Sequence, residues 1–250
     1  MKYIVSVDLG KEQDYTAITV SEVITLDKFV RNMADLHFGT PGRHQFDSVL
    51  RCSYMERPVL GTPYADVIGR VKAVCNRIPV KDDHVLLVDK TGVGNPVVEW
   101  LEREGLKPLP ITITGGNTMT AHDTGGFGVP KVDIAMAMRV ATNEGRFKVV
   151  KGLGMRKGRN GEMEGEDLSA AYVKEASAFV EKITKSGNAS YEAWRERDHD
   201  DIIMSLGMAV WWFLRESPFR LQLAEEVPEE LWDPKKRLRT VAEERKGARK

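Results

Sequence analysis

The most constraining feature of the sequence is an apolar run near its start that carries a single carboxylate. Residues 3–9 are rich in β-branched side chains, include Asp8, and are followed by Gly10 and a polar turn. This pattern is typical of a buried strand that delivers Asp8 to the edge of a sheet. An isolated charge in a low-dielectric interior is costly, so Asp8 requires a hydrogen bond, an ion pair or a bound cation. Other acids at the ends of predicted strands or helices are therefore the candidates to form a functional site with Asp8.

Composition narrows the class of protein but does not identify a partner. The 250 residues include 37 basic and 37 acidic ones, so binding to nucleic acid would have to come from a local basic patch. No run of roughly 18 apolar residues predicts a transmembrane helix, and no secretory signal pattern opens the sequence. We therefore expect an intracellular protein without a membrane segment.

The pattern of predicted elements indicates a mixed α/β sheet flanked by helices. Three antiparallel strands are predicted first, at residues 3–9, 16–24 and 29–38. A β-α-β unit follows, with strands at 84–89 and 109–114 and a helix at 96–104. The remaining predictions are helices at 63–78 and 132–143, a short strand at 146–150, an ambiguous segment at 171–182 and a helix capped by Asp198.

The connecting segments and the C-terminal part of the chain have a different composition. Residues 115–128 are rich in Gly and Thr and are predicted to be a loop. Residues 153–167 contain four glycines between basic and acidic side chains, which favours a polar hairpin or a flexible loop. We expect one domain over residues 1–222, with this hairpin as an insertion, and a charged tail over 223–250.

Four acids form the candidate site. Asp8 and Asp89 each lie at the end of a predicted buried strand, and Asp200 and Asp201 open the last predicted helix. Taken singly, a strand-end Asp is more often a loop cap, and an Asp-Asp pair at a helix start is explained by the helix dipole. If the first and fourth strands are neighbours, however, the carboxylates converge and cannot all stay ionised without a cation.

Hard oxygen ligands of this kind select Mg²⁺ or Mn²⁺. Two such ions about 4 Å apart activate a water and stabilise the leaving oxygen in phosphoryl transfer, so the predicted reaction is phosphodiester hydrolysis. Asp14 is open between an Asx-turn residue and an outer metal ligand. His199 is expected to be a neighbour of the site rather than a ligand, because the site is already rich in harder oxygen donors.

Three blocks in order resemble the nuclease domain of the tailed-bacteriophage terminase large subunit. They are Val7-Asp8-Leu9-Gly10 with Asp14-Tyr15-Thr16-Ala17, Leu87-Val88-Asp89-Lys90-Thr91-Gly92-Val93-Gly94, and His199-Asp200-Asp201-Ile202-Ile203-Met204-Ser205-Leu206. Shorter stretches between them are also similar to that family: Val129-Pro130-Lys131, Glu175-Ala176-Ser177-Ala178-Phe179 and Gly187-Asn188-Ala189-Ser190-Tyr191-Glu192-Ala193. The resemblance covers roughly residues 3–215.

The resemblance implies an RNase H-like fold and a two-metal endonuclease that cuts double-stranded viral DNA during genome packaging. By motif position it implies Asp8, Asp89 and Asp201 as core ligands of Mg²⁺ or Mn²⁺, with Asp200 assisting the second ion. It also favours Asp14 as a further ligand.

The resemblance bears on DNA contacts as well. It places the hairpin near DNA, so its basic residues, Arg156, Lys157 and Arg159, are candidate phosphate contacts, as is Lys131. A solvated loop explains the hairpin basics equally well.

The implied partners are those of viral DNA packaging in the cytoplasm of an infected bacterial host. They are double-stranded DNA, a packaging ATPase, a portal and a small terminase subunit. The sequence lacks the phosphate-loop motif Gly-x-x-x-x-Gly-Lys-Ser/Thr. We therefore expect the ATPase motor to be another domain of a longer protein or a separate chain.

Three other functions remain open from the sequence. A Holliday-junction resolvase has a related fold and chemistry, and a preference for branched DNA would distinguish it. A catalytically silent DNA-binding packaging module is disfavoured by the retention of all four acids. An actin-like or sugar-kinase-type ATPase needs small residues in the first turn for its nucleotide, whereas residues 11–14 are bulky and acidic.

Overall fold

The structure is a computed structural model that describes most of the chain. The described residues are 2–10, 14–25, 48–79, 83–92, 95–123, 125–158, 160, 162–185 and 200–216. The chain divides into two compact units, Met1–Phe213 and Leu214–Lys250. Every described strand and helix lies in the first unit, apart from the last three residues of the last helix.

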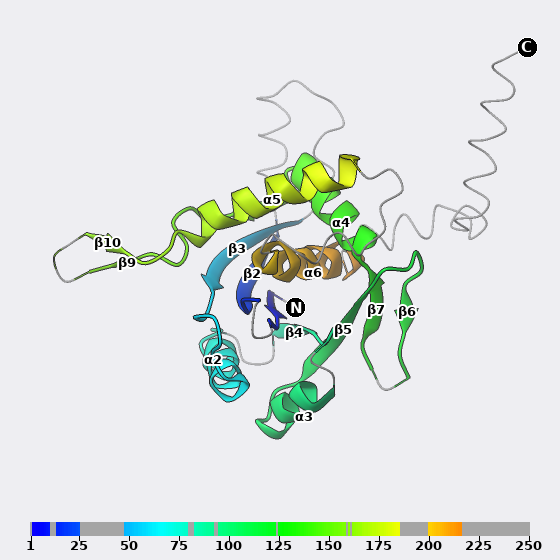
Figure 1. The fold of residues 1–250 in the computed structure, drawn as a ribbon, viewed down its shortest axis with the longest axis horizontal. Coiled ribbons are helices and arrows are strands. Elements are labelled where there is room, and N and C mark those ends of the chain that lie inside the picture. Colours follow the sequence, from blue (N-terminus) through cyan, green and yellow to red (C-terminus); the bar gives the residue numbers. More distant parts are fainter. Residues whose placement is uncertain are drawn as a thin grey trace, which may run out of the picture. The chain divides into compact units, whose positions relative to one another are not determined.

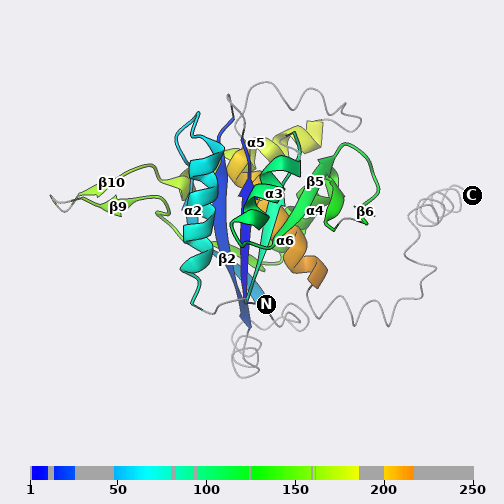
Figure 2. The same ribbon diagram turned by 90° about the horizontal axis from the view of Figure 1, so that it is seen from below.

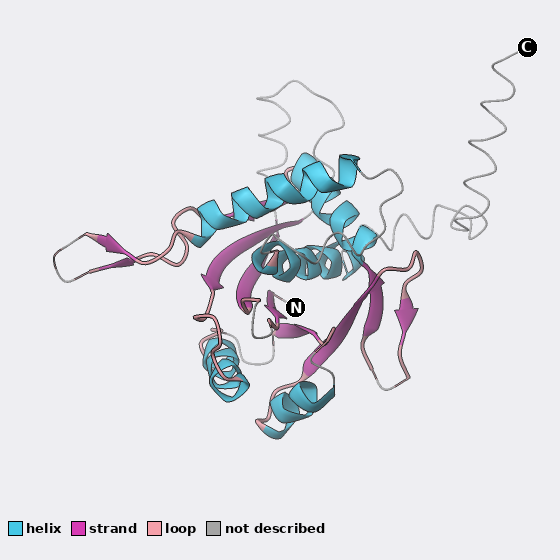
Figure 3. Ribbon diagram, viewed as in Figure 1, coloured by secondary structure: helices cyan, strands magenta, loops and turns pink. Residues whose placement is uncertain are grey.

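The first unit is built on one eight-stranded mixed sheet (Figures 1 and 3). Its strands are β1 (Tyr3–Asp8), β2 (Ala17–Thr25), β3 (Ser48–Glu56), β4 (His84–Asp89), β5 (Pro108–Thr114), β6 (Thr120–Ala121), β7 (Phe127–Pro130) and β8 (Phe147–Val149). Their spatial order is β6-β7-β5-β4-β1-β2-β3-β8. The chain runs antiparallel through β1, β2 and β3, whereas β4, β5 and β7 extend the other side of β1 in parallel. These orders and directions confirm the predicted mixed sheet, in which antiparallel strands are followed by parallel strands.

Helices cover both faces of this sheet. They are α2 (Tyr64–Asn76), α3 (Asn95–Arg103), α4 (Lys131–Asn143), α5 (Leu168–Lys185) and α6 (Asp201–Glu216). Figures 1 and 2 show α2 and α3 on one face and α4, α5 and α6 on the other. A separate hairpin of β9 (Arg156–Lys157) and β10 (Met163–Glu164) projects ahead of α5. Within the described ranges, no helix is both long enough and apolar enough to cross a membrane.

Alternation along β1 decides which side chains face which helices. Val5 and Val7 belong to the core cluster that includes Val67 and Val71 of α2 and Leu101 of α3. Because successive side chains of a strand point to opposite faces, Ser6 and Asp8 point to the face covered by α6. The candidate site therefore lies on the α6 side of the sheet, at the end where β1 finishes.

Several element predictions are confirmed. These are the strands corresponding to β1, β2, β4, β5 and β8, the helices corresponding to α2, α3, α4 and α6, and the hairpin within residues 153–167. The predicted cap of the last helix is wrong: α6 begins at Asp201 and Asp200 accepts its first helical hydrogen bond, whereas Asp198 lies outside the described residues. The ambiguous segment at 171–182 is helical, as part of α5.

Other element predictions need correction or lie outside the described residues. The expected loop at 115–128 is wrong in part, since it contains β6 and the start of β7. The third antiparallel strand is β3, where no strand was expected, and the strand predicted at 29–38 lies outside the described residues. The predicted domain boundary at residue 222 and the tail over 223–250 also lie outside them.

Candidate active site

Asp8 and Asp89 lie side by side at the ends of two neighbouring parallel strands. Val7 of β1 pairs with Val88 of β4, so the next residue on each strand is one of the two acids. Burial, and then the charge of Asp89, raise the pKa of Asp8 well above its usual value. Burial also raises the pKa of Asp89 to about 6, although hydrogen bonds from Thr91 and the Asp8 side chain act in the opposite direction. The two carboxyl groups are therefore a coupled pair that favours holding a proton or a cation.

The turn after β4 fixes the Asp89 carboxylate. Its Oδ1 accepts a hydrogen bond from the Thr91 backbone N–H at 2.7 Å. The Thr91 hydroxyl in turn accepts a hydrogen bond from Ile113 N–H of β5 at 2.7 Å. Gly92 follows with a φ of 82°, a conformation that residues with a Cβ adopt at a cost. The Oδ1 of Asp89 is therefore held by the Thr91 backbone, whereas Oδ2 has no contact with this turn.

A buried hydroxyl contact sets the position of α6 on the sheet. Ser205 Oγ donates to the Ser6 backbone oxygen at 2.9 Å and accepts from Thr19 Oγ1, also at 2.9 Å. Asp201 lies one helical turn before Ser205, about 6 Å along the helix axis. Asp8 lies two residues after Ser6, about 6.6 Å along the strand. A helix that runs opposite to β1 from this contact therefore brings Asp201 over Asp8, and the charge of Asp201 does raise the pKa of Asp8.

The two acids at the start of α6 have different surroundings. Asp200 Oδ2 forms an ion pair with Lys131 Nζ at 2.8 Å. Asp201 is only 5% exposed, and its Oδ2 is buried without a hydrogen-bond partner among the described residues. Burial is the main cause that raises the pKa of Asp201 to about 7, and the charges of Glu175, Asp200 and Asp14 add to it. Asp201 is thus a buried carboxylate with one oxygen that has no hydrogen-bond partner among the described residues.

Asp14 reaches the site from the first turn. Gly10 allows this, because a Cβ there would collide with the backbone carbonyls of Asp14 and Tyr15. Gly10 N–H also donates to Thr16 Oγ1 at 3.1 Å, which closes the turn. The Asp14 side chain is exposed, yet its charge acts on Asp201. The structure therefore brings all five predicted acids into one electrostatically coupled group.

Glu175 is a member of this group that the sequence did not single out as a site residue. It lies in the middle of α5, and its Oε2 accepts a hydrogen bond from Ile203 N–H of α6 at 3.0 Å. Arg57, which follows β3, approaches its Oε1 at 3.5 Å. Burial raises the pKa of Glu175 to about 7 in spite of both contacts. A signal was present: Glu175 occupies the helical stripe of the buried Leu168 and Phe179, where a carboxylate is unexpected.

The donor set fits Mg²⁺ or Mn²⁺ in pairs rather than in a preformed cage. Among the described residues, no three His, Cys, Asp or Glu side chains converge on one point that could hold a metal ion. Mg²⁺ commonly keeps several waters and uses one or two carboxylates, so pairs such as Asp8 with Asp89 suffice. The Oδ2 of Asp201, which has no hydrogen-bond partner among the described residues, is a further candidate oxygen ligand. The prediction of metal ligands at these residues stays a prediction.

This chain is similar in sequence to known viral proteins. No family model matches it. Two curated proteins do, each named "Terminase, large subunit", from Thermus phage G20c and Thermus virus P23-45; each is 23% identical over 230 residues, or 92% of this chain. The chain is similar in sequence to the terminase large subunit. It spans about a third of the length of those relatives, 35% in each case, and the resemblance drawn from the sequence is confirmed at this level.

Solved structures of terminase nucleases are also similar to this chain. The crystal structure of the large terminase nuclease from thermophilic phage G20c is 18% identical with a TM-score of 0.41, covering 83% of this chain and 80% of its own. A second structure of that nuclease, with bound zinc, has a TM-score of 0.42, with 18% identity and coverage of 83% and 79%. The manganese-soaked human cytomegalovirus terminase nuclease domain is 12% identical with a TM-score of 0.40, covering 84% and 83%.

The predicted DNA contacts are divided between two places in the structure. Arg156 and Lys157 are exposed on β9 of the projecting hairpin, while Arg159 lies outside the described residues. Lys131 instead lies within the acidic group, where it pairs with Asp200. A role in DNA binding remains a prediction for all four.

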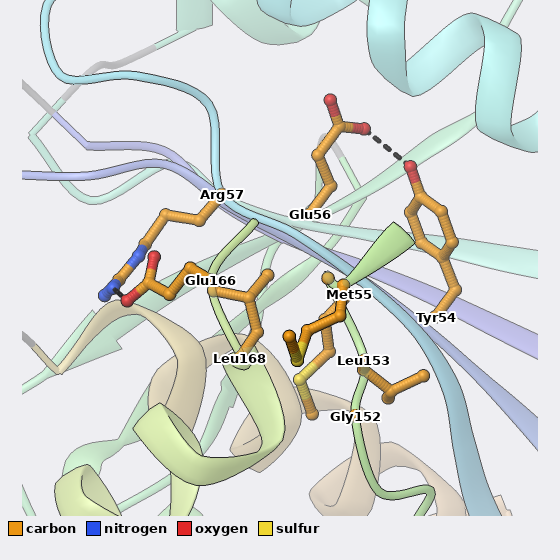
Figure 4. Close-up of a pocket in the computed structure, with 10 residues that line it drawn as sticks. Tyr54, Met55, Glu56, Arg57, Gly152, Leu153, Glu166 and Leu168 are labelled. Carbon is orange, nitrogen blue, oxygen red and sulfur yellow. Dashed lines mark hydrogen bonds and ion pairs between the residues drawn. The ribbon is translucent and has the colours of Figure 1, made fainter. Parts of the chain in front are cut away.

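A cleft of about 460 Å³ lies between the end of β3 and the base of the hairpin, and none of the five acids lines it. Figure 4 shows Arg57 and Glu166 joined at one end of this cleft and Tyr54 and Glu56 joined at the other. Arg57 is therefore shared between the cleft and Glu175 of the acidic group.

Proposed function

We propose that this chain is a two-metal-ion endodeoxyribonuclease that hydrolyses phosphodiester bonds of double-stranded viral DNA during genome packaging. The observation that carries the proposal is the electrostatic coupling of acids from β1, β4 and α6 at one end of the sheet. Such an accumulation of partly buried carboxylates is costly in the absence of a cation. Homology to terminase large subunits supports this substrate over other phosphodiesters.

Each acid has a role in this proposal. Asp8, between Asp89 and Asp201, would contribute to both cation sites, with Asp200 assisting at the second and Asp14 at the edge. Bound Mg²⁺ or Mn²⁺ would supply an activated water and stabilise the leaving oxygen. The turn at Thr91 keeps Asp89 oriented, and the Ser205 contact keeps Asp201 over Asp8. The chain thus contributes preorganised oxygens rather than a nucleophile of its own.

The proposed setting follows from the same homology. We place the chain in the cytoplasm of an infected bacterial host. We expect it to act with double-stranded DNA, a packaging ATPase, a portal and a small terminase subunit. The ATPase is proposed to be another domain of a longer protein or a separate chain.

Cleavage of supercoiled plasmid by the purified chain tests the activity. Mn²⁺ or Mg²⁺ should support conversion to nicked and linear DNA, whereas Ca²⁺ should not, because its looser coordination positions the water poorly. Asp89→Asn should abolish cleavage, while Asp66→Asn, at an exposed acid of α2, should not. Robust cleavage in EDTA, or by Asp89→Asn, would refute the proposal. A strong preference for branched over linear DNA would instead favour a junction resolvase.

A further inference from the structure

The first turn of α6 is capped by a side chain from another helix. Asp200 occupies the N-cap position, because its backbone oxygen accepts the first helical hydrogen bond, from Met204 N–H at 2.9 Å. An N-cap side chain ordinarily accepts a hydrogen bond from the second or third amide of the helix. The Asp200 carboxylate pairs with Lys131 instead, and the third amide, that of Ile203, donates to Glu175.

Glu175 is held firmly enough to perform this role. Its side chain is 8% exposed, and each of its oxygens has a different contact, Ile203 N–H on one side and Arg57 on the other. Arg57 is itself 12% exposed and lies over the Tyr15 ring, 4.8 Å from its centroid. A buried carboxylate with two such partners is fixed in position, since moving it would leave charges unpaired.

The consequence for the site concerns where Asp201 lies. Asp201 is the first residue of α6, and an uncapped first turn of a helix frays. A catalytic carboxylate must keep its position to well within about 1 Å. If Asp200 capped its own helix, its carboxylate would not be available to the site. A cap supplied from α5 both fixes Asp201 and releases Asp200.

We propose that Glu175 is a positioning residue that caps α6 in place of Asp200 and so holds Asp200 and Asp201 ready for divalent cations. This inference rests on the proposed metal-dependent function. It assigns Glu175 no contact with DNA and no place as a ligand. Arg57 is the residue that orients it.

A comparison of two helix caps tests the proposal. Asp167 caps α5 in the ordinary way, since its Oδ1 accepts hydrogen bonds from Ser169 N–H at 3.0 Å and Ala170 N–H at 3.1 Å. Glu175→Ala and Asp167→Ala therefore each remove one carboxylate cap, but only α6 carries the paired acids. Asp167→Ala controls for the loss of stability that follows from losing any cap.

Two measurements on the purified chain separate a cap from a ligand. The first is amide hydrogen exchange without metal, in which Glu175→Ala should lower protection of the Ile203 amide roughly 5- to 30-fold and Asp167→Ala should leave it unchanged. The second is Mn²⁺ affinity by calorimetry, which should weaken roughly 10- to 100-fold in Glu175→Ala and stay unchanged in Asp167→Ala. Glu175→Gln, which keeps an acceptor oxygen for the Ile203 amide but loses the ion pair with Arg57, should retain most of both properties.

The outcomes are distinguishable. If the wild type binds Mn²⁺ and Glu175→Ala binds it equally well, the positioning role is wrong and the proposed function stands. If the wild type does not bind Mn²⁺, the proposed function fails together with this inference. If Glu175→Gln keeps Ile203 protected yet loses Mn²⁺ affinity, the charge of Glu175 matters rather than its cap, which overturns the proposal. Should Glu175→Ala not fold, Glu175→Asp, one methylene too short to span both partners, is interpreted by the same criteria.

Discussion

Replacing Asp201 with asparagine should stabilise the metal-free protein at pH 8. The side chain is almost fully buried, its Oδ2 has no hydrogen-bond partner among the described residues, and its pKa is raised from 3.8 to about 7. A shift of about 3 units corresponds to about 4 kcal/mol at most, and the amide must still find partners. We therefore expect a gain of about 2 kcal/mol, which raises the unfolding midpoint by roughly 4–8 °C in a chain of this size.

The pH dependence gives this prediction its sign. Because the folded-state pKa of Asp201 lies above the unfolded value, the wild type is relatively most stable below the unfolded pKa of 3.8 and loses stability as pH rises toward about 7. Asparagine does not titrate, so the advantage of Asp201→Asn should be full at pH 8 and fall to roughly half or less at pH 5. Mn²⁺ should raise the midpoint of the wild type more than that of the variant, because the variant keeps the Asp8–Asp89 pair and loses a ligand of the second ion.

Thermal unfolding at the two pH values, with and without Mn²⁺, checks this prediction. Asp66→Asn is the matched control, since it makes the same chemical change at an exposed site on α2 and should not raise the midpoint. An Asp201→Asn variant that is less stable than the wild type at pH 8 would refute the reasoning. So would an advantage that is equal at pH 5 and pH 8.

Two further predictions concern packing and DNA binding. A Cβ on the buried Gly207 of α6 would lie 2.5 Å from Ile134 Cγ2, so Gly207→Ala should lower the free energy of unfolding by about 1 kcal/mol, net of its gain in helix propensity. Gly69→Ala, which has open space around its Cβ, should instead raise the free energy of unfolding. Urea unfolding of both variants checks these opposite signs. If the hairpin contacts phosphates, replacing Arg156 and Lys157 with alanine should weaken DNA binding and reduce the slope of log K against log salt by about 2; unchanged affinity and slope would leave the hairpin without this role.

The parts of the fold that local patterns determine were predictable from the sequence. The strands ending at Asp8 and Asp89 are near-continuous apolar runs, because they are buried on both faces, and such runs are conspicuous. Once both were recognised as parallel neighbours, the proximity of their acids followed. β3 was missed although Leu50, Arg51, Cys52 and Ser53 alternate between buried and exposed, a pattern typical of a half-buried strand.

The roles of the supporting residues of the candidate site could not be predicted, because these roles depend on contacts between distant segments. Glu175 contacts an amide 28 residues away, and Lys131 pairs with Asp200, 69 residues away. Local propensity carries no information on which helix end a carboxylate will cap.

The central claim is that acids from β1, β4 and α6 together hold divalent cations. Anomalous diffraction from crystals soaked in Mn²⁺ tests it most directly. We predict two peaks about 4 Å apart, one between Asp8 and Asp89 and one between Asp8 and Asp201. The same soak of Asp8→Asn crystals should lose both peaks. Wild-type crystals that show no manganese among these carboxylates, or manganese bound only elsewhere, would contradict the account.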